Sequence, residues 1–172
     1  MPVNLLAVLN EPNAPLQATA AATLALLVKH IVTVFAQGGA RFGAGMRPPE
    51  DVCFMPQAGT QSFDGTAKTA EKGNEDKGLK KAKEIEQRWT RIVANDLENI
   101  PLGLIIAWGA LQSPLSASAH IVLVFSFAVS RVLHTVTYAM GKQPHRAITF
   151  FGGLLSVVGL SINGLLGALG KK

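Results

Sequence analysis

The sequence is poor in cysteine and in charged residues, and each shortage excludes a class of protein. Cys53 is the only cysteine, so the chain cannot build an intrachain disulfide framework or a metal site made of several thiolates. Only 16% of its 172 residues are charged, whereas 48% are hydrophobic, and the mean hydropathy is positive at +0.28. This composition is too apolar for an ordinary soluble domain of the same length. We therefore expect an integral membrane protein.

The chain also lacks the signals of export and of nucleic-acid binding. Residues 1–13 contain no basic region ahead of an apolar stretch and no cleavage pattern, so we expect no removable signal peptide. The formal net charge of +5 would suit a nucleic-acid partner, but the Lys and Arg residues lie between apolar segments instead of gathering with aromatic side chains. No repeat of solenoid period is visible, so a single domain over residues 1–172 is the simplest interpretation.

Four apolar segments approach the length of about 20 residues that a helix needs to cross the hydrocarbon core of a bilayer. They cover about residues 16–37, 88–111, 116–140 and 147–169. The first and the last are the clearest, whereas the second is apolar only from Ile100 onward and is charged before it. The sequence therefore predicts an all-α membrane protein whose subunit is a bundle of four transmembrane helices.

One long polar loop, about residues 41–85, joins the first two segments, and the other two loops are short. The long loop contains eight Lys and Arg residues, the loop around Pro144 contains two, and the loop around Pro114 contains none. The positive-inside rule then places loops one and three in the cytosol and both termini on the other side. Residues 71–87 alternate acidic and basic side chains, so they form either a solvated helix leading into the second span or an exposed linker.

Polar side chains recur at helical spacing inside two of the predicted spans. Positions i, i+3, i+7 and i+10 of the second span, and i, i+3 and i+7 of the third, each lie on one helical face: Arg88, Arg91, Asn95 and Glu98 in the second, and Arg131, His134 and Tyr138 in the third. A charge inside a bilayer costs about 2.5–3.5 kcal/mol, so such residues face the bundle interior and are paired or functional. Both stripes lie near the cytosolic loops, and we expect them to converge at one depth with Arg146.

This set of side chains suits a small zwitterionic ligand with several carboxylates. Arginine forks bind carboxylates in bidentate geometry, and a glutamate accepts an ammonium group. The structural alternative is that Arg and Glu pairs only join helices, and we favour it for Asp96 and Asn99, which lie on another face of the second span. We expect Lys29, alone in the first span with His30, to extend its ammonium toward the membrane surface.

Four motifs resemble those of a known family, in the same order along the chain. Residues 95–101, Asn-Asp-Leu-Glu-Asn-Ile-Pro, resemble the second-helix signature of the membrane-associated proteins in eicosanoid and glutathione metabolism. Residues 131–138 resemble its third-helix signature, residues 144–151 the start of its fourth helix, and Pro49-Glu50-Asp51 the motif after its first helix. Within the family, the motifs are most similar to the microsomal glutathione S-transferase 1 branch, and the prostaglandin E synthases are a near relative.

The resemblance implies a homotrimer in the endoplasmic reticulum membrane, with glutathione bound between neighbouring subunits near the cytosolic face. It implies conjugation of glutathione to hydrophobic electrophiles from the bilayer, together with peroxidase activity on lipid hydroperoxides, and it implies no metal. Arg146 would be the catalytic residue, because a cation near a thiol lowers the thiol pKa and stabilises the thiolate. The residues implied in glutathione binding, directly or as support, are Arg41, Arg91, Asn95, Glu98, Arg131, His134 and Tyr138.

The sequence departs from the family pattern at a few positions. Thr90 and Val93 stand where the family often has basic residues, which weakens the expected hold on an anion. Ala147 stands where prostaglandin E synthases have a serine, which argues against that isomerase chemistry. The spacing from Arg41 to the motif at Pro49 is one residue off the usual pattern.

Two hypotheses from other classes remain beside the transferase. In a transport or channel subunit the polar stripes would line a path through the membrane. Residues 102–111 and 121–127 are almost wholly apolar, so such a path would be closed at one end. The other hypothesis is a non-catalytic scaffold or regulatory subunit that keeps the fold of the family.

Overall fold

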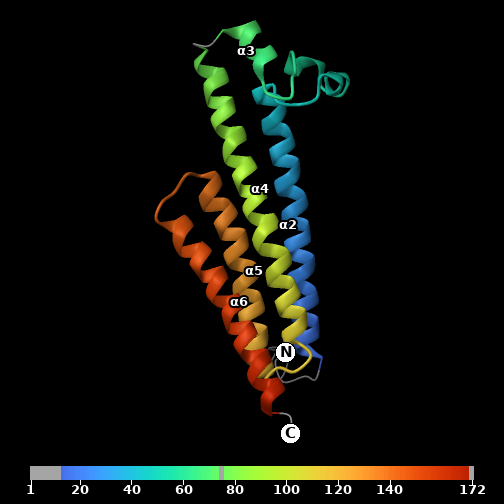
Figure 1. The fold of residues 1–172 in the computed structure, drawn as a ribbon, viewed down its shortest axis with the longest axis vertical. Helices are drawn as coiled ribbons and strands as arrows, with labels where there is room; N and C mark the ends of the chain where they lie inside the picture. The colour runs from blue at the N-terminus through green and yellow to red at the C-terminus, as the bar shows by residue number, and fades with distance from the viewer. Residues whose placement is uncertain (1–12, 74–75, 171–172) are drawn as a thin grey trace, which may run out of the picture. The chain divides into compact units, whose positions relative to one another are not determined.

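The computed structural model describes residues 13–73 and 76–170, and that part of the chain contains helices and no β-strand (Figure 1). This confirms the all-α prediction. The absence of a signal peptide was predicted from residues 1–13, of which 1–12 lie outside the described residues. The elements of the described part are α2 (Ala14–Ala44), the short 3-10 helices η1 (Pro49–Cys53) and η2 (Pro56–Ala58), α3 (Thr66–Lys72), α4 (Lys77–Ala110), α5 (Ala117–Ala139) and α6 (His145–Gly170).

Three of these helices, α2, α5 and α6, are long and apolar enough to cross a membrane. Their most apolar stretches have mean hydropathies of 1.7, 1.6 and 1.7, and they contain the predicted first, third and fourth spans. Helix α4 contains the predicted second span but is not apolar enough to qualify by composition, because polar and charged residues fill the part before Ile100.

The helices extend beyond two of the predicted spans, and both extensions adjoin the long loop. Helix α2 continues to Ala44 instead of ending near residue 37, and α4 begins at Lys77 instead of residue 88. Residues 77–87 therefore follow the helical alternative. Hydropathy locates the apolar part of a helix, whereas Lys, Glu, Gln and Ala extend it in water because they are good helix formers.

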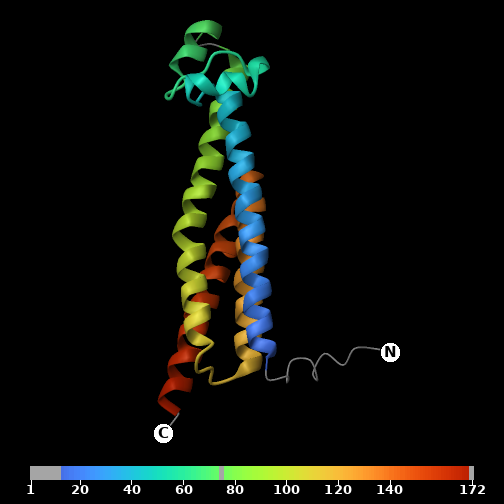
Figure 2. The same ribbon diagram turned by 90° about the vertical axis from the view of Figure 1, so that its right-hand side faces the viewer.

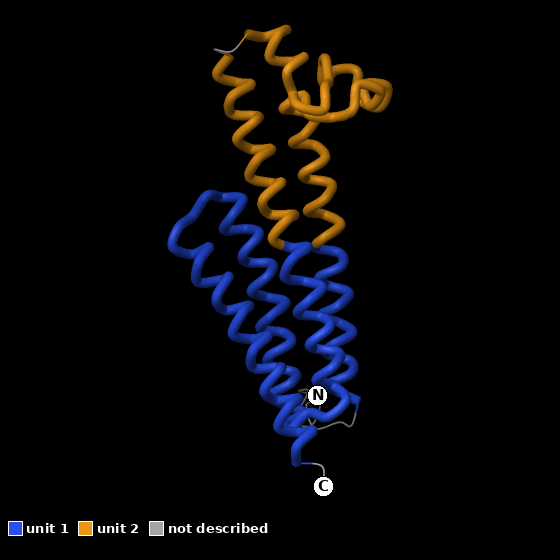
Figure 3. Tube along the Cα trace, in the orientation of Figure 1, with its two compact units in different colours: residues 1–29, 96–172 blue, residues 30–95 orange. Residues whose placement is uncertain are grey.

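The chain forms two compact units, and both α2 and α4 contribute residues to each of them (Figure 3). Of the described residues, unit 1 contains 13–29 and 96–170, and unit 2 contains 30–73 and 76–95. Within unit 1, α5 and α6 form an antiparallel hairpin (Figure 2).

The core of unit 1 combines small side chains from α2 with larger ones from α5. Ala18, Ala22 and Leu26 repeat every four residues on one face of α2 and are buried in the same cluster as Phe127. Gly103 gives the ring of Phe127 its space on α4, since a Cβ atom at this glycine would lie 2.2 Å from the ring. The glycine thus lets α4 and α5 approach closely.

The turn before α5 is held by an asparagine of α6. Asn163 accepts a hydrogen bond from the backbone N–H of Ser116 at 3.0 Å and donates one to its carbonyl oxygen at 3.2 Å. The Ser116 hydroxyl in turn accepts from the backbone N–H of Ala119 at 3.2 Å and caps the first turn of α5.

In unit 2, a buried lysine side chain donates hydrogen bonds to the C-terminal turn of α2. Lys68 of α3 is 6% exposed, and its ammonium donates to the carbonyl oxygens of Phe42, Gly43 and Ala58 at 3.2, 3.0 and 2.6 Å. The carbonyls of Phe42 and Gly43 belong to the last turn of α2, where helical partners are missing and a cation is favoured. Burial lowers the pKa of the Lys68 ammonium from its ordinary value.

Residues 45–73 of the predicted loop thus fold into short helices and ordered turns, and we call this segment the cap. Its turn before α3 is held by Asp64, whose carboxylate accepts from the backbone N–H of Thr66 at 3.0 Å and from its hydroxyl at 2.7 Å. These hydrogen bonds, the backbone one above all, hold the pKa of Asp64 below its ordinary value.

Candidate functional site

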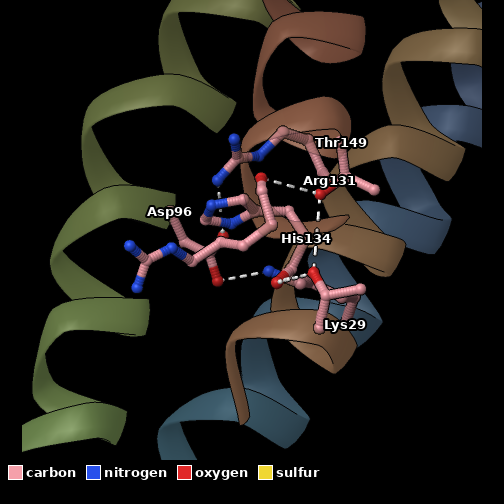
Figure 4. Close-up of polar contacts among 7 residues, drawn as sticks. Lys29, Asp96, Arg131, His134 and Thr149 are labelled. Carbon is pink, nitrogen blue, oxygen red and sulfur yellow. Dashed lines mark hydrogen bonds and ion pairs between the residues drawn. The ribbon is translucent and has the colours of Figure 1, made fainter. Parts of the chain in front are cut away.

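In unit 1, one carboxylate and two cations from three different helices form a cluster of ion pairs (Figure 4). Asp96 on α4 accepts from Arg131 Nη2 on α5 at 3.2 Å, and it also pairs with the ammonium of Lys29 on α2. The side chains of Asp96, Arg131 and Lys29 are 0, 1 and 9% exposed. We call these three residues the Asp96 cluster. With two cations and one anion, it carries an excess of one positive charge.

The Asp96 cluster agrees with one sequence interpretation and corrects another. Asp96 has the interhelical ion pairs that the structural interpretation expected, because it joins α4 to α2 and to α5. The expectation that Lys29 extends to the membrane surface is wrong, because a carboxylate on the neighbouring helix already binds its ammonium. Isolated charges of opposite sign in two consecutive spans were the signal that could have predicted this pair.

The predicted stripe on α5 continues from the Asp96 cluster toward α6. His134, 3% exposed, lies one turn after Arg131, and its Nδ1 atom has no hydrogen-bond partner among the described residues. The ring of His134 meets the ring of Tyr138 edge to face, with centroids 5.6 Å apart. The guanidinium of Arg146 then lies 4.6 Å from the centroid of the Tyr138 ring. The stripe therefore links a buried ion cluster to the predicted catalytic arginine.

The position of Arg146 depends on the turn between α5 and α6. Gly141 has a φ of 68°, and its N–H donates to the Tyr138 carbonyl at 3.0 Å. The N–H of Lys142 reaches back to the carbonyl of Thr137 at 2.9 Å. These two bonds and the left-handed glycine make a Schellman motif, which ends α5 and leads directly into α6. When the side-chain amide of Gln143 is turned so that its oxygen faces Arg146, this oxygen accepts hydrogen bonds from Nη2 and Nε of Arg146.

Only part of the predicted stripe on α4 is exposed. Arg91 and Glu98 are exposed, and neither forms an ion pair with any residue of the described part. Asn95 and Arg88 are half-buried. Within unit 1, Glu98 is exposed while Arg131 and His134 are buried, so these three side chains do not line one pocket of the subunit, and their convergence at one depth stays a prediction. The helical period of 3.6 residues predicts which side chains share one face of a helix, but it does not predict which other helix that face contacts.

Arg41, the remaining predicted ligand, lies near the end of α2 in unit 2. Its Nε atom is 3.5 Å from the carboxylate of Glu86 on α4. The same carboxylate accepts from the hydroxyl of Thr90 at 2.7 Å, and that hydroxyl accepts from the amide of Gln37 at 3.0 Å. Thr90 therefore joins two helices of unit 2.

A cavity of about 30 Å³ lies between α4, α5 and α6, with Asn99 and Arg131 as the polar residues of its lining. This volume holds roughly two water molecules and no tripeptide. In the described residues, no group of three or more His, Cys, Asp or Glu side chains is arranged to hold a metal ion.

The helices and the charges within them define an integral membrane protein with polar stripes inside its spans. The model of the MAPEG family matches residues 19–166, so the chain belongs to the MAPEG family. MAPEG proteins have a four-helix membrane fold, and the family includes glutathione-dependent transferases, peroxidases and isomerases as well as non-catalytic members. No curated protein matches the chain.

Proposed function

We propose that this protein is a glutathione transferase that conjugates glutathione to hydrophobic electrophiles dissolved in the bilayer, as the microsomal glutathione S-transferase 1 branch of the family does. Peroxidase activity on lipid hydroperoxides belongs to the same proposal, because it uses the same thiolate. We also propose that the protein lies in the endoplasmic reticulum membrane, with loops one and three in the cytosol.

The observation that carries the proposal is the pair of exposed charges on α4. Arg91 and Glu98 have no ion-pair partner in the described part of the chain, yet they lie on a helix of a membrane protein. Each would cost about 2.5–3.5 kcal/mol if lipid covered it, so a polar partner is needed. A homotrimer with glutathione between its subunits supplies that partner.

The charges and donors of these residues suit the functional groups of glutathione. Arg91 and Arg41 offer guanidinium forks to its two carboxylates, and Glu98 offers a carboxylate to its ammonium. Asn95 adds an amide that hydrogen-bonds peptide groups. In this proposal Arg131 and His134 support the ligand from behind, because both side chains are buried.

Arg146 would stabilise the reactive sulfur. Its guanidinium rests on the ring of Tyr138, a cation–π contact that orients the plane of its donors without neutralising its charge. A fixed cation next to a thiol favours the thiolate, and the thiol proton leaves to bulk water. The sulfur then attacks the electrophile, while binding between subunits holds the two reactants in position.

A non-catalytic scaffold is the second candidate. It is favoured by Thr90, which makes helix-joining hydrogen bonds at a position where the family often has a basic residue. The isomerase alternative lacks the serine expected at Ala147, and the transport alternative lacks a polar path through the apolar halves of the spans.

The proposal is tested by titrating the purified full-length protein with glutathione and by measuring turnover of a chlorodinitrobenzene-type electrophile. We expect Glu98→Ala to weaken binding by roughly 10- to 100-fold, since a hydrogen bond to a charged group contributes about 1.5–3 kcal/mol. Arg146→Ala should keep most of the binding and lose thiolate formation and turnover. Lys142→Ala, an exposed change in the same turn, is the matched control. Wild-type protein that binds glutathione but does not turn over would favour the scaffold, and protein that does not bind it would refute the proposal.

A further inference from the structure

The Asp96 cluster contains one cation more than helix joining requires. The pair of Asp96 and Arg131 is already neutral and almost fully buried. Lys29 adds a second positive charge to the same carboxylate, with only 9% of its side chain exposed. Charges in such a place are weakly screened, so this excess acts over a longer distance than a surface charge does.

The excess charge lies on the side of the bundle that leads to Arg146. His134 lies one turn after Arg131 on α5, its ring meets the ring of Tyr138, and the Arg146 guanidinium lies 4.6 Å from the centroid of that second ring. The charged groups along this row come from four helices: Lys29 from α2, Asp96 from α4, Arg131 from α5 and Arg146 from α6. Another carboxylate on α4, that of Glu98, is exposed. Figure 4 shows the labelled side chains gathered around His134. The residues Arg131, His134 and Tyr138 thus form a continuous row from the Asp96 cluster to Arg146.

We propose that the excess positive charge of the Asp96 cluster stabilises the thiolate of glutathione bound near Arg146, so that Lys29 promotes ionisation and Asp96 limits it. Neither residue touches the ligand, and no covalent bond is made. The equilibrium is the loss of the thiol proton to bulk water. This inference rests on the proposed function and adds to it a remote control of the reactive sulfur.

Two substitutions should act in opposite directions, which a purely structural role would not produce. Lys29→Met makes the cluster neutral, so less thiolate should form at a given pH. Asp96→Asn leaves two cations, so more thiolate should form. At an effective dielectric constant of about 20, a unit charge on the order of 10 Å from a titrating group changes its pKa by roughly one unit. We therefore expect each variant to move the thiol titration by about one pH unit, or roughly tenfold in thiolate at pH values below the midpoint.

The control is Lys29→Arg, which keeps the charge and should restore the wild-type titration. This pair of variants at position 29 decides the matter even when Asp96→Asn does not fold. The full-length protein in lipid nanodiscs is saturated with glutathione, and the ultraviolet absorbance of the thiolate is followed against pH. S-methylglutathione, which has no titratable thiol, provides the blank.

The inference is supported when Lys29→Met titrates at higher pH than both wild type and Lys29→Arg while still binding glutathione. Equal midpoints for Lys29→Met and Lys29→Arg would overturn it and leave the proposed function intact. Movement of Lys29→Met and Asp96→Asn in the same direction would also overturn it, since that result indicates a structural effect alone. Wild-type protein that forms no thiolate with glutathione would overturn both proposals together.

Discussion

Removing the carboxylate of the Asp96 cluster should destabilise the protein more than any other change in the cluster. Asp96→Ala leaves the guanidinium of Arg131 and the ammonium of Lys29 close together with no anion between them. Removing one partner of a buried ion pair costs about 3–5 kcal/mol. Because the side chains of Asp96 and Arg131 are 0 and 1% exposed, water cannot replace the lost partner, and we expect a value in the upper half of this range.

The other two changes should cost less. Lys29→Met keeps the neutral pair of Asp96 and Arg131 and replaces one charge with an apolar chain of similar length, so we expect a change within about 1 kcal/mol. Arg131→Met leaves Asp96 paired with Lys29 and loses one charged hydrogen bond, for which we expect about 1.5–3 kcal/mol. The double variant Asp96→Ala/Arg131→Met should be more stable than Asp96→Ala alone, because the uncompensated guanidinium is gone.

The assay is unfolding in mixed micelles of a mild detergent with increasing sodium dodecyl sulfate, followed by the loss of helical circular dichroism. The order of unfolding free energies decides the interpretation. If Lys29→Met is as destabilising as Asp96→Ala, or if the double variant shows the sum of the two single losses, then the three side chains do not act as one buried ion cluster and the reasoning fails.

Three further predictions concern packing, the cap and pH. Gly103→Ala should lower the unfolding free energy by about 1–3 kcal/mol, since its Cβ atom would collide with a packed aromatic ring, whereas Gly109→Ala on the same helix meets nothing within 4 Å and should gain up to about 1 kcal/mol in the same assay. Lys68→Met should remove the ammonium that the carbonyls of Phe42, Gly43 and Ala58 share and so increase limited proteolysis of residues 45–73, whereas Lys72→Met, at an exposed position, should not. The pKa of Asp64 is lower in the folded cap than in an unfolded chain. The Asp64 carboxylate therefore stabilises the cap fully above about pH 4, and this stabilisation is lost as the pH falls through the lowered pKa. Amide exchange at residue 66 should rise over that pH range in wild type and not in Asp64→Asn.

The spans were the most predictable part of the fold, for a physical reason. Lipid requires long apolar stretches, so composition alone located α5 and α6 to within two residues at each end. The polar extensions of α2 and α4 leave no such signature. Neither does the cap, whose closure depends on one ammonium reaching carbonyls up to 26 residues away in the chain. Such contacts follow from the folded geometry and not from any local pattern.

The candidate site was predictable as stripes and not as contacts. Helical spacing placed Arg131, His134 and Tyr138 on one face, and the structure keeps them there next to Arg146. Spacing could not tell that Asp96 would take Arg131 as its partner, because the choice depends on how the helices rotate against one another. For the same reason, the outward position of Glu98 became visible only in the structure.

The turn at Gly141 between α5 and α6 determines where Arg146 lies relative to Tyr138. A residue inserted between His145 and Arg146, in the first turn of α6, would rotate Arg146 by about 100° around the helix axis and shift it by about 1.5 Å along that axis. One such change would carry the guanidinium of Arg146 away from the face of Tyr138. The chemistry proposed for Arg146 therefore depends on the register with which the turn starts α6.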